Sequence, residues 1–277
     1  MLSGGTRLVG LLGYPLSHSL SPRMQNAAFA ARGLEWAYVP LPVEPSRLEA
    51  AVGGLVALGF AGANVTIPHK TSVVAFCDEL DAVAEKAGSV NTLVVRDGRI
   101  LGSSTDGAAV VDQVEAAGAD VLVLGAGGAA QAVATALLEA GCASLRVAAR
   151  SQERAHALAS RLLSIFPERA LGVEERWPPP GDEPTLVVNA TPVTEEPLLE
   201  PRAGLAVVDL AYRPDGRPTA LVRAARARGC SVVDGVDVLV AQGAASFERW
   251  TGVPAPVEVL RRAARGGGPT EAAEPLP

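Results

Sequence analysis

The sequence predicts an α/β fold that is built largely from parallel β-sheet. Short runs rich in Val, Leu and Ala alternate with helical patterns along most of the chain, which is typical of βαβ units. Several of the runs are continuously apolar, as expected for strands that helices cover on both faces. A Gly-rich turn follows one of these runs, at a position where parallel sheets commonly bind a ligand.

The expected elements follow from the position of each apolar run and of its flanking turn residues. Ser21-Pro22 places a capping hydroxyl before Pro at the first helical position and opens a helix to about Gly33. A second helix opens at Pro45-Ser46 and runs to about Leu58. Further helices are expected over 128–140 and 152–164, and strands over 7–13, 36–41, 60–66, 90–95, 120–125, 144–149, 185–189, 205–210 and 231–234.

Composition excludes several classes of protein. With 277 residues and 48% hydrophobic residues, the chain has ample material for a buried core. A net charge of −6 argues against a general nucleic-acid or anionic membrane surface. Cys77, Cys142 and Cys230 are few, odd in number and far apart, so we expect reduced thiols in a cytoplasmic protein and no metal site.

A dinucleotide-binding pattern occupies the turn after the strand at 120–125. Gly125-x-Gly127-x-x-Ala130 supplies a tight turn, a close backbone approach to a pyrophosphate and close packing of helix on strand. The pattern has its required context, because a strand precedes it and a helix with a second strand follows. The sequence therefore predicts a nucleotide site.

The end of the second strand favours NADP over NAD. Folds that select NAD usually place an acidic residue there to hold the ribose 2′-hydroxyl. This chain instead has Ala149-Arg150-Ser151, with Arg154 three residues later. A guanidinium can bind a 2′-phosphate through two hydrogen bonds, and Ser151 can donate a third. The alternative is a cationic edge that only faces solvent.

Polar clusters stand at the ends of the N-terminal strands. They are Ser17-His18-Ser19-Leu20-Ser21, Asn64-Val-Thr66-Ile-Pro68-His69-Lys70, Ser89-Val-Asn91-Thr92 and Ser103-Ser104-Thr105-Asp106. Loops at the carboxyl ends of strands are where α/β folds bind ligands, and hydroxyls around a helix N-terminus suit a carboxylate. We therefore expect these clusters to form a substrate site.

Lys70 is unusual in a chain that uses arginine for nearly all its positive charge. Only Lys70 and Lys86 are lysines among the 24 Lys and Arg residues. Arginine cannot lose its proton in a protein, whereas lysine can. We expect Lys70 to carry a proton, and Lys86 to be a cation at a helix C-terminus and nothing more.

At this point the chain resembles the shikimate dehydrogenases. The motifs HSLSP, NVTIPHK, AGSVNT, STDG, GAGGAA, NAT, DLAY and GVDVLVAQGAASFERWTG occur in the order typical of that family, from about Gly10 to Gly252. The resemblance implies reversible, NADPH-dependent reduction of 3-dehydroshikimate to shikimate, in the pathway to chorismate and the aromatic amino acids. It also implies an NADP-dependent oxidoreductase acting on a CH–OH group.

The resemblance further implies two domains, a Rossmann-type NADP-binding domain and a discontinuous α/β substrate domain. The expected boundaries are 1–106 for the first part of the substrate domain and 107–240 for the NADP-binding domain. Helices over 241–265 return to the substrate domain, and 266–277 is expected to be a flexible tail.

The site residues that the resemblance implies fall into three groups. Lys70 and Asp106 match the catalytic pair, and Asp106 also binds a substrate hydroxyl. Ser19 and Ser21 would hold the substrate carboxylate; Thr66, Asn91, Tyr212 and Gln242 would bind the rest of the substrate. Gly125, Ala126, Gly127, Gly128 and Ala129 would cradle the pyrophosphate, Ala149, Arg150, Ser151 and Arg154 would surround the 2′-phosphate, and Thr191, Leu210 and Gly235 would lie near the ribose and nicotinamide.

Three positions depart from the family pattern. Ser104 and Ala149 stand where the family usually has Asn, and Val238 stands where a Met is common. These changes concern the affinity and selectivity for the cofactor, and none touches the acid–base pair. His18 and His69 are alternative proton carriers by chemistry, but the family does not depend on a histidine there.

Two other functions remain open from the sequence. One is a quinate/shikimate dehydrogenase that uses NAD, against which Arg150 counts. The other is a non-catalytic nucleotide-binding sensor, which would tolerate loss of Lys70 or Asp106. We expect a small-molecule substrate, no nucleic-acid or membrane partner, and a monomer or homodimer.

Overall fold

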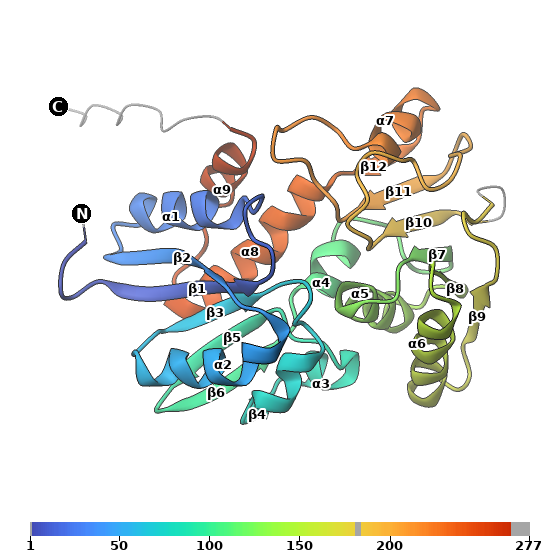
Figure 1. Cartoon of the computed structure of the whole chain (residues 1–277). Coiled ribbons are helices and arrows are strands. Elements are labelled where there is room, and N and C mark those ends of the chain that lie inside the picture. Colours follow the sequence, from blue (N-terminus) through green and yellow to red (C-terminus); the bar gives the residue numbers. More distant parts are fainter. Residues whose placement is uncertain (1, 181–183, 267–277) are drawn as a thin grey trace.

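The computed structural model describes residues 2–180 and 184–266, and over these residues the chain forms two six-stranded sheets (Figure 1). The first sheet has the strand order β2-β1-β3-β5-β6-β4, and the second has the order β12-β11-β10-β7-β8-β9. The strands are β1 (Arg7–Gly13), β2 (Trp36–Pro42), β3 (Gly62–Val65), β4 (Glu79–Leu80), β5 (Thr92–Arg96), β6 (Arg99–Ser103), β7 (Asp120–Leu124), β8 (Ser144–Ala148), β9 (Ala170–Glu174), β10 (Leu186–Asn189), β11 (Ala206–Asp209) and β12 (Ser231–Val233).

The second sheet is parallel in all of its recorded pairings. The first sheet is mixed, because β3–β5 and β5–β6 pair antiparallel while its other pairs are parallel. The β5–β6 hairpin turns at Asp97 and Gly98, which both have positive φ angles of 52° and 74°. The predicted α/β class with two mainly parallel sheets is confirmed.

The helices predicted to open at Ser21 and Pro45 and over 128–140 and 152–164 agree with the structure to within about three residues, whereas the first of the helices expected over 241–265 begins earlier, at Gly235. The helices are α1 (Ser21–Ala31), α2 (Leu48–Ala57), α3 (Ala82–Ala87), α4 (Asp106–Val111), α5 (Gly128–Glu139), α6 (Gln152–Ile165), α7 (Ala220–Ala227), α8 (Gly235–Thr251) and α9 (Val257–Ala264). The helix predicted from Pro45 begins as a 3-10 turn, Pro45–Arg47, because its first residues do not reach the α-helical hydrogen-bond pattern until Leu48. No helix of the described residues is long and apolar enough to cross a membrane.

The last two helices complete the core of the first sheet. Phe247 and Trp250 of α8 and Leu260 of α9 are buried in one apolar cluster with Val9 and Phe29. The Trp250 indole donates to the carbonyl of Leu93 on β5, at 2.9 Å. In Figure 1, α8 runs from the second sheet towards the first, and α9 lies beside α1. The tail predicted over 266–277 lies outside the described residues beyond Gly266.

Helix α3 of the first half packs against α5 and α6 of the second. The Lys86 ammonium lies 2.6 Å from a carboxylate oxygen of Glu139 on α5. The Arg161 guanidinium on α6 donates to the Lys86 carbonyl at 2.7 Å, so it binds the C-terminal end of α3. A Cβ at Gly88 would collide with that guanidinium. The expectation that Lys86 is only a helix-end cation was therefore too narrow.

Candidate active site

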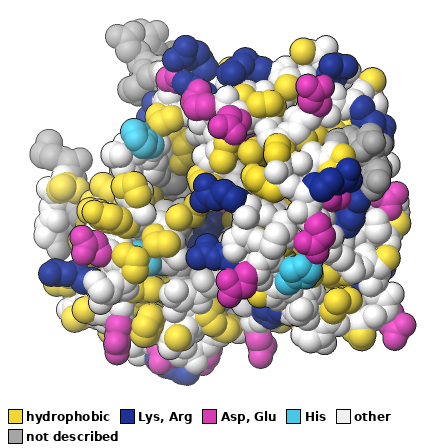
Figure 2. All heavy atoms as spheres, turned by 45° about the vertical axis from the view of Figure 1, so that its right-hand side comes forward, with side chains coloured by type: hydrophobic (Ala, Val, Ile, Leu, Met, Phe, Trp, Pro, Cys, Tyr) yellow, Lys and Arg dark blue, Asp and Glu magenta, His cyan; other side chains and the backbone are white. Residues whose placement is uncertain are grey.

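A cavity of about 490 Å³ lies between the two halves of the chain. Its walls combine residues from the ends of β1 and β3 with residues that follow β10 and β11 and with the first turns of α8. Figure 2 shows one face of the molecule, on which Lys and Arg side chains lie around a central hollow while acidic and hydrophobic ones are interspersed elsewhere.

Lys70 and Asp106 form a close ion pair in this cavity. The Lys70 Nζ lies 2.5 Å from Oδ2 of Asp106, and their side chains are 14% and 6% exposed. Lys70 follows β3, and Asp106 is the first residue of α4. The fold therefore brings together two residues that are 36 positions apart, largely shielded from water but still open to the cavity.

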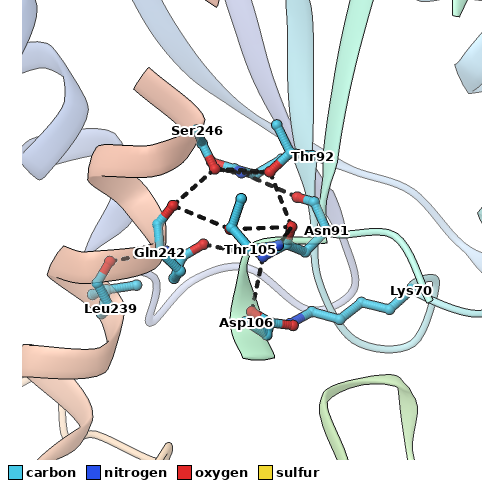
Figure 3. Close-up of polar contacts among 9 residues, drawn as sticks. Lys70, Asn91, Thr92, Thr105, Asp106, Leu239, Gln242 and Ser246 are labelled. Atoms are coloured by element: carbon cyan, nitrogen blue, oxygen red, sulfur yellow. Dashed lines mark hydrogen bonds and ion pairs between the residues drawn. The ribbon is translucent and has the colours of Figure 1, made fainter. Parts of the chain in front are cut away.

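The second oxygen of the Asp106 carboxylate is also occupied (Figure 3). Asn91 Nδ2 donates to Asp106 Oδ1 at 2.8 Å, while Asn91 Oδ1 accepts from the Thr105 backbone N–H at 2.9 Å. With one oxygen bound by Lys70 and the other by Asn91, the carboxylate has a fixed orientation. Asn91 is 2% exposed and lies behind the pair, outside the cavity lining.

A buried polar network extends from Asn91 to α8. Asn64 Nδ2 donates to Oγ of Ser246 at 2.9 Å and to Oγ1 of Thr92 at 3.2 Å, and Asn64 Oδ1 accepts from the Tyr38 hydroxyl at 2.9 Å. Burial raises the pKa of Tyr38 well above its ordinary value, so this phenol stays a donor. The sequence predicted no individual role for Asn64. The signal that could have indicated one is the polar amide side chain within the otherwise apolar, buried strand β3.

Ser19, Ser21 and Tyr212 also line the cavity, where the Ser19 hydroxyl lies beside the Tyr212 phenol. Burial raises the pKa of Tyr212, against the smaller opposing effects of the Leu20 backbone and the Ser19 hydroxyl. The prediction that Ser21 caps α1 is wrong. The helix begins at Ser21 itself, Leu20 occupies the cap position, and Ser19 Oγ accepts from the Ser21 N–H at 3.2 Å.

Thr66 and Gln242 also line the cavity. The Gln242 amide on α8 donates to the Leu239 carbonyl at 2.9 Å, which leaves its oxygen 3.4 Å from Asn91 Nδ2. Gln242 therefore joins α8 to the polar network around Asp106 (Figure 3).

The Gly-rich turn fits a dinucleotide pyrophosphate. Gly125 has a φ angle of 112°, which favours glycine, and Gly127 is the cap residue of α5. No atom lies within 4 Å of the position that a Cβ would take at Gly127, so the backbone there is open to a ligand. A Cβ at Gly128 would lie 2.6 Å from Lys70 Cβ, so the predicted cofactor turn directly contacts Lys70.

The residues predicted to surround a 2′-phosphate lie at the end of β8. Arg150, Ser151 and Arg154 are exposed, whereas Ala149 is buried. Ser151 caps α6, because its side chain accepts from the Arg154 N–H at 3.4 Å. Two exposed guanidinium groups beside a helix N-terminus fit a phosphate.

Three further segments bring Thr191, Leu210 and Gly235 to the cavity. Thr191 follows β10, Leu210 follows β11, and Gly235 begins α8. A Cβ at Gly235 would collide with the carbonyl of Ala211, so these segments are in close contact.

The structure thus places some of the predicted site residues in the lining of the cavity and the others outside that lining. Ser19, Ser21, Thr66, Lys70, Asp106, Ala129, Thr191, Leu210, Tyr212, Gly235 and Gln242 line it. Its lining also includes His18 and Asn64 of the predicted polar clusters, Val238 of the family comparison, and Pro192 and Leu239, which were not predicted. His69 is 1% exposed and its Nε2 lies 2.7 Å from the Val43 carbonyl, so it faces away. Among the described residues, no cluster of three or more His, Cys, Asp or Glu could hold a metal.

Comparison with known proteins gives one consistent result. Family models described as "Shikimate dehydrogenase substrate binding domain", "Shikimate / quinate 5-dehydrogenase" and "Shikimate 5'-dehydrogenase C-terminal domain" match residues 11–93, 108–169 and 235–265. The chain is 47% identical to the NADP(+) shikimate dehydrogenase of Rubrobacter xylanophilus, over 96% of this chain and 98% of that one.

Solved structures agree with this result. A shikimate dehydrogenase in complex with NADP+ has a TM-score of 0.86 at 34% identity, over 95% of this chain and 96% of that one. A shikimate 5-dehydrogenase from Thermus thermophilus, in complex with NADP(H) and shikimate, has a TM-score of 0.79 at 34% identity, over 94% and 99% of the two chains.

Proposed function

The chain belongs to the shikimate dehydrogenase family, and on this premise we propose that it catalyses the reversible, NADPH-dependent reduction of 3-dehydroshikimate to shikimate. The reaction serves the pathway to chorismate and the aromatic amino acids. The single observation that supports this activity best is the Lys70–Asp106 ion pair of 2.5 Å, which lies directly beside the Gly-rich turn.

The chemistry requires a proton donor at the ketone oxygen. NADPH, when bound, supplies the hydride. As negative charge develops on the oxygen, the Lys70 ammonium donates a proton to it, and in the reverse direction neutral Lys70 accepts the proton. Asp106 holds the ammonium in place, and Asn91 in turn fixes the carboxylate.

Binding of the substrate carboxylate is assigned to hydroxyl groups. Ser19, Ser21 and Tyr212 line the cavity, and each can donate a hydrogen bond to an anion. The raised pKa of Tyr212 keeps its phenol protonated at neutral pH. Thr66 and Gln242, which line the cavity, would bind the ring hydroxyls, whereas Asn91 lies outside the lining and would act through the Asp106 carboxylate that it holds.

NADP(H) would lie across the second sheet. The backbone from Gly125 to Ala129 would hold its pyrophosphate at the N-terminus of α5. Arg150 and Arg154, with the Ser151 hydroxyl, would bind the 2′-phosphate. A chain that selects NAD would have an acidic residue in their place, so the alternative with NAD is not favoured.

We also propose the domain division at 106/107 and 240/241, a cytoplasmic location, and a monomer or homodimer. The apolar cluster that α8 and α9 share with β1 and α1 supports their return to the substrate domain, although Val236 and Val240 of this cluster precede the second boundary, which lies within α8. Analytical ultracentrifugation of the full chain would determine the number of subunits.

One experiment tests the proposed function. Steady-state oxidation of shikimate and of quinate is measured with NADP+ and with NAD+. We expect shikimate with NADP+ to give the highest kcat/KM of the four combinations. Turnover of quinate with NAD+ at a higher kcat/KM would identify the alternative enzyme, and no shikimate turnover with either cofactor would overturn the proposal.

A further inference from the structure

Asp209 is a buried carboxylate that the proposed reaction does not use. It ends β11, its side chain is 0% exposed, and three donors point at it. Thr219 Oγ1 donates to its Oδ2 at 2.5 Å, and Asn189 Nδ2 donates to its Oδ1 at 2.8 Å. The backbone N–H of Ala211 donates to the same Oδ1 at 3.0 Å.

Two of these donors belong to segments that line the cavity. Asn189 ends β10, and its Oδ1 accepts from the N–H of Thr191 at 2.9 Å and from its hydroxyl at 2.7 Å. Ala211 directly precedes Tyr212, and both line the cavity. The third donor, Thr219, caps α7, because its Oγ1 accepts from the Val222 N–H at 3.2 Å.

We propose that Asp209 is a positioning residue that holds the loops of Thr191 and Tyr212 in the geometry that binds NADP(H) and substrate. This inference rests on the proposed function of the same site. Asp209 touches neither the cavity nor the reacting atoms, so it acts only through the groups that it holds.

The polarity of the network explains why an acidic residue is required. An ionised carboxylate only accepts hydrogen bonds, so Asn189 must turn its NH2 group towards Asp209. The Asn189 oxygen then faces Thr191, where it accepts two hydrogen bonds. An amide at position 209 would place a second NH2 group among these donors and remove the constraint on how the Asn189 amide is oriented.

The pKa of Asp209 predicts that this positioning role depends on pH. Burial raises the pKa of Asp209 to about 6, against the hydrogen bonds from Thr219, Ala211 and Asn189. The Asp234 carboxylate, which is itself paired with Arg226 and Arg265, raises it further. As pH falls through about 6, protonation therefore converts one acceptor oxygen into a donor, and the hydrogen bonds from Asn189 and from the Ala211 backbone must rearrange.

The test compares Asp209→Asn with Asp120→Asn in the full-length protein. Asp120 begins β7, at the amino end of a strand in the same sheet, and is exposed, so it is a matched control. NADP+ binding to the free protein is measured by calorimetry at several pH values, together with KM and kcat for shikimate. For Asp209→Asn we expect a Kd for NADP+ about tenfold weaker at pH 7.5, from the loss of a hydrogen bond to a charged group.

The 2′-phosphate of NADP+ also titrates near pH 6, so the Kd of every variant should weaken as pH falls through this range. We expect the wild-type Kd to weaken more steeply than that of Asp209→Asn, and the difference between the two to report Asp209. Asp120→Asn should match the wild type throughout. Wild-type affinity and an unchanged pH profile in Asp209→Asn would overturn the proposal.

A second pair of variants decides the matter if Asp209→Asn does not fold. Thr219→Ser keeps the hydroxyl that donates to Asp209, and Thr219→Val removes it. Weaker NADP+ binding in Thr219→Val with recovery in Thr219→Ser supports the proposal, and equal binding in the two contradicts it. If the wild type binds NADP+ but does not oxidise shikimate, the proposed function fails while the binding data still test Asp209.

Discussion

The two lysines of the chain show how the setting of a residue determines its role. Each forms a short ion pair, of 2.5 Å for Lys70 with Asp106 and 2.6 Å for Lys86 with Glu139. The first pair is largely buried beside a cavity, whereas the side chains of the second are 42% and 38% exposed. An exposed pair contributes little to stability and has no reacting group to serve.

Replacing Lys70 should reduce turnover far more than substrate affinity. Lys70→Ala removes the proton donor, and Lys70→Arg keeps the charge but cannot give up its proton at ordinary pH. We expect kcat to fall by about 10²–10⁴ in both variants, with a much smaller change in KM. Steady-state kinetics in both reaction directions measures this.

The second lysine supplies the control. Lys86→Arg makes the same substitution at a residue outside the cavity and should leave kcat unchanged. A Lys70→Arg variant with near-normal turnover would exclude Lys70 as the proton carrier.

At the scale of the element, the Gly-rich turn contains two adjacent glycines with different tasks. A Cβ at Gly127 meets no atom within 4 Å, so Gly127→Ala should fold normally but should obstruct the pyrophosphate. A Cβ at Gly128 would lie 2.6 Å from Lys70 Cβ and 2.9 Å from Ser89 Oγ, so Gly128→Ala must push α5 away from the first half.

We therefore expect Gly127→Ala to raise the KM for NADP+ with an unchanged Tm, and Gly128→Ala to lower both the Tm and kcat. Thermal unfolding and kinetics of the two variants separate these effects. The same response in both variants would show that the turn has a single role.

The buried carboxylate at the end of β11 should reduce stability at neutral pH. The pKa of Asp209 is about 6 in the folded chain against an ordinary value of 3.8, so the folded state binds the proton more tightly than the unfolded state. Its contribution to stability is thus complete below about pH 3.8 and is lost as pH rises through about 6. The difference corresponds to about 3 kcal/mol.

Denaturant unfolding of the wild type and of Asp209→Asn at a series of pH values measures this contribution. The unfolding free energy of the wild type relative to the variant should increase as pH falls from about 7.5 to about 4.5. A pH-independent difference would show that the carboxyl has an ordinary pKa.

The sequence predicted those strands and turns that a local residue pattern determines. Continuously apolar strands such as β7 and β10 were expected because both faces are covered, and the Gly-rich turn was expected from its spacing. The strands β4, β6 and β9 were not expected. β4 has two residues, β9 is only partly buried at a sheet edge, and the Asp97-Gly98 turn that signals β6 was overlooked.

The site could be predicted only in part for a related reason. Lys70, Asp106, Asp209 and Ser246 all stand in sequence motifs, but the motifs do not show what the last two contact. Asp209 and Ser246 acquire their roles from partners in other segments, such as Asn189 and Asn64. Ser246 contacts Asn64 across 182 positions, and no local pattern reports that contact.

On the scale of the whole molecule, the end of the chain stabilises its beginning. Leu260 of α9 is 0% exposed in the cluster that contains Val9 and Phe29. We expect Leu260→Ala to cost about 2–5 kcal/mol and to speed hydrogen exchange in α1 and β1, but not in β7 or β8.

Val257→Ala is the matched control, since Val257 lies on the same helix and is 40% exposed. It should leave both stability and exchange nearly unchanged. Faster exchange in β7 and β8 of the Leu260→Ala variant would show that the two halves unfold as one unit.

The return of α8 and α9 to the first sheet also has a consequence for synthesis of the protein. When the ribosome has made the strands β1 to β6, the apolar face that Phe247, Trp250 and Leu260 will cover is still bare. All of the second sheet must be translated before those residues emerge, so the nascent chain carries an exposed, aggregation-prone face through most of its elongation. The half that is synthesised first therefore completes its apolar core last. We expect chaperones at the ribosome exit to bind the nascent chain until then.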